Sequence, residues 1–158
     1  MSVFRSMQDS QFTDWLLGSD SIWTYPLVLT LHTVGLAILV GASVVIHLRL
    51  LGVGPGVPPE RLRVLYRFIW SGFLLNLVTG IMLFITQAAD RAVDPVFYVK
   101  LLSIFVALWL GQRAKRFLTG AVGVDAGQRR QARLVAVAGL ALWAVGIVAG
   151  RLVAYLGK

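Results

Sequence analysis

Two histidines, His32 and His47, are the side chains in this sequence whose chemistry could define a functional site. Fifteen positions separate them on one long apolar stretch, which places them about 22 Å apart if that stretch is a helix. One metal ion therefore cannot bind both side chains. Fifteen steps of about 100° leave a net rotation near 60°, so both histidines lie on broadly one side of the helix. Because neutral imidazole is a common metal ligand, we predict His32 and His47 as metal ligands at two depths.

The spacing of fourteen residues between the histidines resembles the paired histidines of membrane b-type cytochromes. In those proteins one helix supplies ligands to two haems stacked across the bilayer, and a second helix supplies the opposite ligands. This sequence holds no third histidine. A parallel homodimer would supply the opposite ligands from the first helix of its partner; otherwise the haem is five-coordinate, or is completed by Met7, Met82 or a small ligand.

Small and basic residues near the histidines complete the predicted cofactor site. Gly35 lies one helical turn from His32 and would let a flat macrocycle approach the backbone, although close packing of two helices also uses small residues. Lys100 and Arg151 come from helix ends on the same side of the membrane as His32, where they would meet haem propionates or would extend to the lipid headgroups. Arg49 is expected beside His47. The alternative to a ligand role for His47 is that of an interfacial residue. The predicted cofactor-binding residues are His32, His47, Gly35, Lys100, Arg151 and Arg49.

The elements that must position these residues are apolar helices. The chain has 158 residues, of which 58% are hydrophobic, and a mean hydropathy of +0.78, too apolar for an ordinary soluble domain. A bilayer core about 30 Å thick requires roughly 20 helical residues. The stretches that predict spans are 23–51, 66–86, 96–112 and 134–156.

Local signals between the apolar stretches predict where the helices begin and how they connect. The segment GVGPGVPPE at 52–60 forms a loop that no helix crosses. Asp94 followed by Pro95 is typical of a helix N-terminus, and Asp125 is placed to cap the fourth helix. Short connections favour neighbouring antiparallel helices. We therefore predict an all-α protein, a membrane four-helix up-down bundle forming one domain over residues 1–158.

The distribution of basic residues predicts the orientation of this bundle. Ten of the 15 basic residues lie in or beside two of the connections, namely Arg49, Arg61, Arg63, Arg67, Arg113, Lys115, Arg116, Arg129, Arg130 and Arg133. Arginine and lysine are retained in cytoplasmic loops, so both termini are expected outside, in the periplasm. We expect the bacterial cytoplasmic (inner) membrane as the location and the lipid bilayer as a partner. We expect no nucleic-acid partner, because topology accounts for the net charge of +8.

The first twenty residues and the acidic residues restrict the function further. Residues 1–20 mix apolar and polar side chains with a rough helical period, which suits either an interfacial helix or a disordered segment. Every acidic residue lies outside the predicted spans, and the chain has no cysteine. Hydrolytic chemistry and carboxylate-based ion transport within the membrane are therefore disfavoured.

Four short motifs carry a family resemblance. The segments LHTVGLAILVG, HLRLLG, LVTG and DPVFYVKLL resemble a large family of uncharacterised small bacterial four-helix membrane proteins, over about residues 27–110. Members of that family often carry aspartate where this sequence has His47. A more distant likeness is to HemJ-type protoporphyrinogen oxidases and CopD-like copper-resistance membrane proteins, with His32, Arg49 and Lys100 at the matching positions. The resemblance to the HemJ-type proteins implies haem b as ligand, but the later histidine of that pattern is absent here.

We conclude from the sequence that the chain is a haem b-binding membrane protein acting in electron transfer or haem handling, with His32 as the axial ligand. The alternative is a non-catalytic membrane subunit or assembly factor, whose polar groups only orient and pack helices. Whether the protein is an enzyme is left open. We expect it to form a homo-oligomer or to join a membrane complex.

Overall fold

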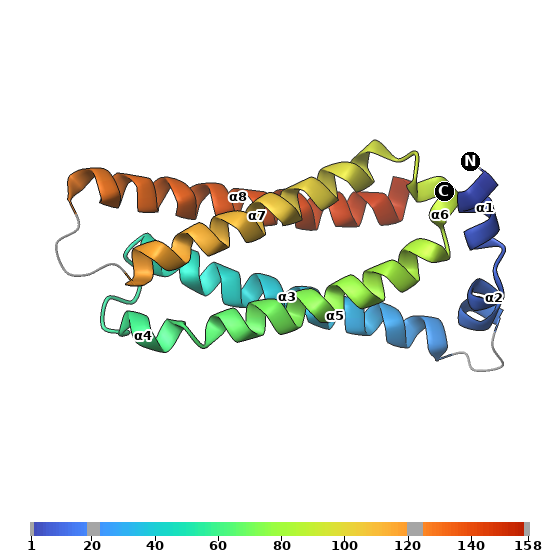
Figure 1. Cartoon of the computed structure of the whole chain (residues 1–158), viewed down its shortest axis with the longest axis horizontal. Helices are drawn as coiled ribbons and strands as arrows, with labels where there is room; N and C mark the ends of the chain where they lie inside the picture. The colour runs from blue at the N-terminus through green and yellow to red at the C-terminus, as the bar shows by residue number, and fades with distance from the viewer. Residues whose placement is uncertain (1, 19–22, 120–124, 157–158) are drawn as a thin grey trace.

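The structure, a computed structural model, describes residues 2–18, 23–119 and 125–156. These residues form helices and short connections, and the described part of the chain contains no β-strand. The helices are α1 (Ser2–Gln8), α2 (Gln11–Gly18), α3 (Thr24–Leu50), α4 (Pro59–Leu62), α5 (Leu65–Ile85), α6 (Ala88–Arg91), α7 (Pro95–Thr119) and α8 (Ala126–Leu156), as labelled in Figure 1. The predicted all-α class is therefore confirmed.

Four helical segments are long and apolar enough to cross a membrane, as the sequence predicted. They are Thr24–Leu50, Glu60–Ile85, Pro95–Leu118 and Ala126–Tyr155. The third helix continues beyond its predicted end at 112, and the fourth begins before its predicted start at 134. Both extensions are rich in arginine. Arginine interrupts the apolar pattern from which the ends were predicted, but it favours helix formation, so the helices continue through it.

Two aspartates cap the long helices at the positions that the sequence indicated. Asp94 Oδ1 accepts a hydrogen bond from the backbone N–H of Val96 at 2.8 Å. Asp125 Oδ1 accepts one from the backbone N–H of Gln128 at 2.7 Å. Each bond satisfies one of the free amides in the first turn of a helix, so the starts of α7 and α8 are fixed locally.

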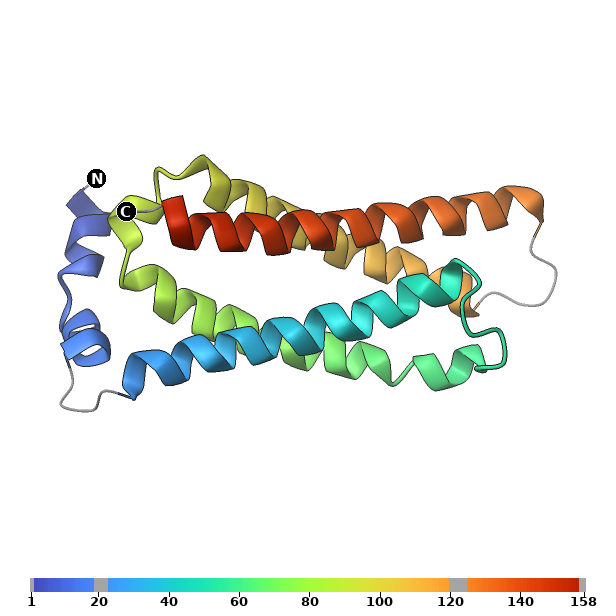
Figure 2. The ribbon, with the colours of Figure 1, turned by 180° about the vertical axis from the view of Figure 1, so that it is seen from behind.

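The long helices form two pairs, with α3 along α5 and α7 along α8 (Figure 1). The short helices α1, α2 and α6 lie at one end of the molecule, which we call the capped end, and α4 lies at the other. Seen from behind, α3 and α8 approach each other near the α4 end and separate towards the capped end (Figure 2). The two pairs therefore diverge in the half of the molecule that the short helices cover.

The pair formed by α3 and α5 crosses at two facing glycines. A Cβ added to Gly35 would lie 2.9 Å from the backbone nitrogen of Asn76, and one added to Gly72 would lie 2.7 Å from that of Leu39. These distances are too short for any side chain, so the two backbones touch. The contact fixes the rotation of α5 about α3 and thereby decides which α5 residues face His32.

The tightest packing lies in the half of the molecule near α4. Leu39, Ile46 and Trp143 are almost completely buried there. Tyr66 adds a polar contact, because its hydroxyl donates to the carbonyl of Gly111 at 3.1 Å and so joins α5 to α7. Most other long side chains on the four helices point outward and are apolar, which suits hydrocarbon as the surrounding medium.

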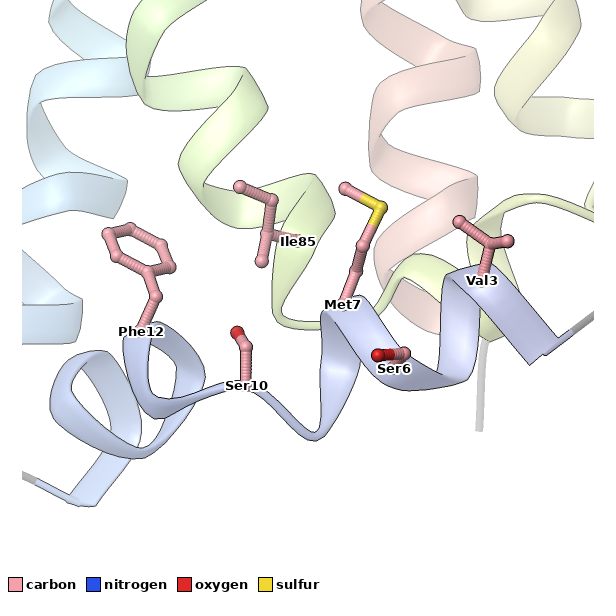
Figure 3. Close-up of a pocket in the computed structure, with 6 residues that line it drawn as sticks. All are labelled: Val3, Ser6, Met7, Ser10, Phe12 and Ile85. Carbon is pink, nitrogen blue, oxygen red and sulfur yellow. The ribbon is translucent and has the colours of Figure 1, made fainter.

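Residues 2–18 form two short helices, whereas the sequence suggested one interfacial helix or disorder over residues 1–20. Residues 1, 19 and 20 of that prediction lie outside the described residues. Leu16 and Thr13 are buried, while Trp15 is exposed. A pocket of about 540 Å³ lies between these helices and the end of α5. Figure 3 shows the residues that line it, which are Val3, Ser6, Met7, Ser10, Phe12 and Ile85. The apolar sides of α1 and α2 thus face the four-helix body.

Candidate functional site

Two adjacent cavities lie where the helix pairs diverge. The first, of about 350 Å³, lies mainly between α5 and α7, and the second, of about 240 Å³, lies among α3, α5, α7 and α8. Both are lined by the same central residues, which are His32, Gly80, Phe84, Phe97 and Lys100. We call the two together the His32 cavity. Its size falls in the range of small-molecule sites, which is about 300–1,000 Å³.

His32 is held in the cavity by contacts with Thr79, Asn76 and Gly80 of α5. The ring Nδ1 lies 3.0 Å from Thr79 Oγ1, and the Thr79 hydroxyl is itself 2.7 Å from the carbonyl of Leu75, to which it donates. Since a hydroxyl has one proton, Thr79 must accept from His32 Nδ1–H. This assigns the tautomer from the hydrogen-bond network and leaves Nε2 of a neutral ring with a lone pair, 3.4 Å from Asn76 Nδ2.

Asn76 and Gly80 complete the contact between α5 and His32. The Asn76 amide donates to the backbone carbonyl of His32 at 2.9 Å, which fixes the position of the backbone beside the ring. A Cβ on Gly80 would lie 3.1 Å from His32 Cε1, so the absence of a side chain there makes room for the imidazole. Asn76, Thr79 and Gly80 follow the i, i+3, i+4 spacing of one helix face. That face of α5 therefore contacts and positions His32.

Aromatic rings form the wall of the cavity on the side of the capped end. Phe84 of α5 stacks on Phe97 of α7, with ring centroids 5.4 Å apart and planes inclined by 21°. Phe4 of α1 meets Phe84 edge-on at 6.4 Å. The remaining lining is dominated by apolar side chains, so a ligand in this cavity must itself be largely apolar.

Lys100 brings a positive charge into this apolar space. Its side chain runs along Gly150 of α8, where an added Cβ would lie 3.5 Å from Lys100 Cε. No acidic residue in the described part of the chain lines either cavity, and the Lys100 ammonium group makes no hydrogen bond or ion pair with the described residues. A charge with no partner in a low-dielectric site is costly. The cavity therefore favours a ligand that carries a negative charge.

Arg91 also lines the cavity, but its positive charge already has protein partners. Its guanidinium donates to the carbonyl of Val153 at 2.6 Å and to Gln87 Oε1 at 2.5 Å, and it pairs with Asp94 at 3.7 Å. These contacts join α6 to the end of α8. Arg91 thus closes the capped end of the cavity, whereas Lys100 is the charge available to a ligand.

His47 lies apart from His32, in the tightly packed half of the molecule. The side chain is fully buried, and Nδ1–H donates to the carbonyl of Ser43 at 2.7 Å. Nε2 has no hydrogen-bond partner among the described residues, and a Cβ on Gly139 would fall 2.2 Å from it. The imidazole therefore lies flush against the backbone of α8, and in this arrangement no macrocycle fits between them.

The structure separates the other predicted site residues from the His32 cavity. Gly35 contacts α5 at the helix crossing, so its open side is filled by a neighbouring backbone. Arg49 donates to the carbonyl of Pro55 at 3.3 Å, near the α4 end. Arg151 is exposed and lies over the ring of Tyr155 at 5.1 Å. Of the predicted set, only His32 and Lys100 are brought together.

Sequence reasoning missed several residues of the cavity, namely Gly80, Phe84, Gln87, Arg91 and Phe97. The spacing of Asn76, Thr79 and Gly80 was a usable signal, because two polar groups and a glycine on one face of an apolar helix indicate a contact with a polar side chain. The two phenylalanines carried no such signal, since apolar spans commonly contain phenylalanine.

Comparisons with known proteins add no family to this description. No protein family, curated protein or solved structure matches the chain. Within the described residues there is also no group of three histidine, aspartate or glutamate side chains that could hold a metal ion. The fold and the cavity therefore define the class only as a protein with four helices able to span a membrane and a largely apolar, positively charged cavity between them.

Proposed function

We propose that this chain is a multi-pass protein of the bacterial inner membrane that binds haem b in the His32 cavity and acts in electron transfer or haem handling. In this proposal α3, α5, α7 and α8 cross the bilayer as an up-down bundle. The capped end faces the periplasm, and the α4 end faces the cytoplasm. The basic residues of α4, of the end of α7 and of the start of α8 support this orientation, because these segments lie at the α4 end.

The observation that carries the proposal is a histidine oriented by a hydroxyl in a cavity with an uncompensated lysine. Histidines that bind a metal commonly donate their other ring N–H to a nearby acceptor, which fixes the ring and its tautomer. His32 has this arrangement with Thr79, which leaves Nε2 as the candidate ligand atom. Lys100 is the candidate partner of a propionate carboxylate, since a charged hydrogen bond suits a site of low dielectric.

The other lining residues suit the body of a porphyrin. Phe84 and Phe97 offer flat apolar surfaces, and Gly80 leaves space beside the imidazole. Bound haem would supply an iron centre that exchanges single electrons, and its potential would depend on the axial ligand and the surrounding polarity. The chain itself would hold the ring, neutralise one carboxylate and exclude water from the iron.

A second candidate function is a non-catalytic membrane subunit or assembly factor. The contacts of His47 with Gly139 and of Gly35 with Gly72 favour it, because these residues serve helix packing. In that case the contact of His32 with Thr79 would likewise only orient α3 on α5. The two proposals differ in whether the cavity holds a coloured ligand.

An absorption spectrum of the purified protein distinguishes haem binding from the role of a non-catalytic subunit. The protein is produced with haem supplied, purified in detergent, and measured oxidised and reduced. We expect a Soret band that is lost in His32→Ala and retained in His47→Gln, the matched control on the same helix. A folded but colourless wild-type protein, with the same elution volume and helicity as the variants, would favour the subunit. A band lost equally in both variants would contradict His32 as the particular ligand.

A further inference from the structure

We propose that the ligand of the His32 cavity enters and leaves sideways, from the hydrocarbon of the bilayer, through an opening between α5 and α7. We call this opening the α5–α7 portal and define it by Leu77, Ile81 and Phe105. The ligand class is then a molecule dissolved in the membrane that carries an acidic group. The identity of the ligand as haem rests on the proposed function, but the portal does not.

Among the described residues, contacts between α1, α5, α6 and α8 cross the capped end. Phe4 covers Phe84 edge-on, and the side chain of Gln8 accepts a hydrogen bond from the backbone N–H of Ala89 at 3.1 Å. Arg91 joins α6 to α8 through the carbonyl of Val153. A path to the cavity through this end would require breaking contacts from α1, α6 and α8 together.

The α4 end is closed by the core. Trp143 and Ile46 are at most 2% exposed, and the Tyr66 hydroxyl joins α5 to α7 through Gly111. A ligand arriving from this side would have to pass through close-packed side chains over most of the helix length. Protein interiors of this kind contain few voids larger than a water molecule.

The wall between α5 and α7, by contrast, consists of side chains that already face outward. Leu77, Ile81 and Phe105 line the cavity and are nevertheless 42%, 52% and 59% exposed. Helix α5 packs along α3 and helix α7 along α8, so neither helix covers this side of the other. In a bilayer these exposed side chains would contact acyl chains, and their rotation alone would admit a flat apolar molecule.

The charge inside the cavity makes such a portal selective. Neutral acyl chains can reach the portal but cannot compensate the ammonium group of Lys100. A membrane-dissolved molecule with a carboxylate can reach the portal and also compensate this charge, because it offers apolar surface to the phenylalanines and a negative charge to the lysine. The portal and Lys100 together therefore favour an amphipathic acid over bulk lipid.

The portal can be tested without haem, because the chain contains no cysteine. Leu101→Cys places one thiol in the cavity lining, and the protein is reconstituted into phosphatidylcholine vesicles. We expect a lipophilic uncharged maleimide to label this thiol faster than a sulfonated, membrane-impermeant maleimide. Adding Ile81→Trp should slow the lipophilic labelling by about tenfold, equivalent to about 1.4 kcal/mol in the barrier.

Leu74→Trp is the matched control, since Leu74 is 60% exposed on the same helix and does not line the cavity. It should leave the labelling rate unchanged. Leu77→Trp is a second portal variant for the case that Ile81→Trp does not fold. Faster labelling by the charged reagent, or equal slowing by Leu74→Trp, would overturn the portal.

A haem experiment separates the portal from the proposed function. Vesicles containing haem b are mixed with protein vesicles, and uptake is followed by absorbance in wild type, Ile81→Trp, and a Gln8→Cys/Ala89→Cys pair tethered by a short bismaleimide. We expect Ile81→Trp to slow uptake and the tether to leave it unchanged. Uptake slowed only by the tether would overturn the portal while supporting haem binding. The expected labelling with no haem uptake would support the portal and contradict the proposed function.

Discussion

At the scale of single residues, the two histidines differ in what surrounds them. His32 meets a hydroxyl and a glycine from α5 and lines a cavity, whereas His47 is fully buried against the backbone of α8. Both rings donate through Nδ1 to an oxygen and keep Nε2 as the unprotonated nitrogen. The tautomer is therefore the same. The neighbours of Nε2 differ, because the Asn76 amide lies 3.4 Å from that of His32 and the backbone of α8 at Gly139 lies against that of His47.

The hydroxyl of Thr79 should matter for the ligand more than for folding. Thr79→Val keeps the shape of the side chain but removes the acceptor of the His32 N–H. We expect haem affinity to fall by about 10- to 100-fold, the usual effect of losing such a supporting contact. Titration of the purified protein with haem b measures this change. Thr79→Ser retains the hydroxyl and should restore the binding, and failure of that rescue would contradict the hydrogen-bond argument.

Removal of the Lys100 charge should have opposite effects on binding and on stability. In Lys100→Met the ligand loses a charge-assisted hydrogen bond of about 1.5–3 kcal/mol, so we expect roughly ten- to a hundredfold weaker haem binding. The protein without ligand should melt at a higher temperature, because an uncompensated buried charge has gone. Haem titration and thermal denaturation in detergent measure the two effects. Arg151→Met, on the exposed side of α8, should change neither.

At the scale of the helices, close approaches at glycines decide the geometry. Facing glycines join α3 to α5, and single glycines on α5 and α8 receive the two histidine rings. The same residue type thus has three roles on these helices: backbone contact, space for a buried side chain and, at Gly41, an open surface with nothing within 4 Å of an added Cβ.

The crossing of α3 and α5 should not tolerate a side chain. Gly72→Ala places a methyl group against the backbone of Leu39, and we expect a loss of about 1–3 kcal/mol in stability. Gly41→Ala is the matched control on α3 and should stabilise by about 0.5–1 kcal/mol through the higher helix propensity of alanine. Denaturation in mixed detergent micelles measures both. Equal tolerance of the two changes would show that this crossing is not fixed by backbone contact.

The contact of His47 with Gly139 can be examined by a double-mutant cycle. Gly139→Ala alone should destabilise, because the added Cβ overlaps His47 Nε2. His47→Ala removes the overlapping ring, so the double variant should lose less stability than the sum of the two single changes. We expect an interaction free energy of about 1–3 kcal/mol from the same unfolding measurements. Simple additivity would mean that the ring moves aside freely.

At the scale of the whole molecule, the structure is closed at the α4 end and widened at the capped end. The core lies where α3 and α8 approach, and the cavity lies where they separate. Basic residues gather towards the closed end, while α1, α2 and α6 cover the widened one. The proposed orientation places the cavity in the outer half of the bilayer.

This orientation predicts which connections can be labelled from each side of the membrane. A cysteine at Gly54, in the connection before α4, should react with an impermeant maleimide only after the inner membrane is opened. A cysteine at Val93, between α6 and α7 and 59% exposed, should react in intact spheroplasts. The reverse pattern would overturn both the orientation and the periplasmic side of the cavity.

The sequence by itself determined the four apolar helices and the starts of two of them. Length and hydropathy decide whether a segment can span a membrane, and Asp94 and Asp125 cap through bonds to residues two or three positions away. These are local properties, so they can be predicted without knowing the partners of a helix. The same local information suggested His32 and Lys100 as candidates for a site.

Only the tertiary structure decided which candidates share a site. His32 and His47 lie on one helix and look alike in sequence, but Gly80 leaves room beside one and Gly139 presses against the other. Lys100 joins His32 because α7 enters the widened half, while Arg151 faces outward on α8. The rotation of each helix and the angle at which pairs cross set these neighbours. They depend on contacts between segments distant in the chain, which no local period records.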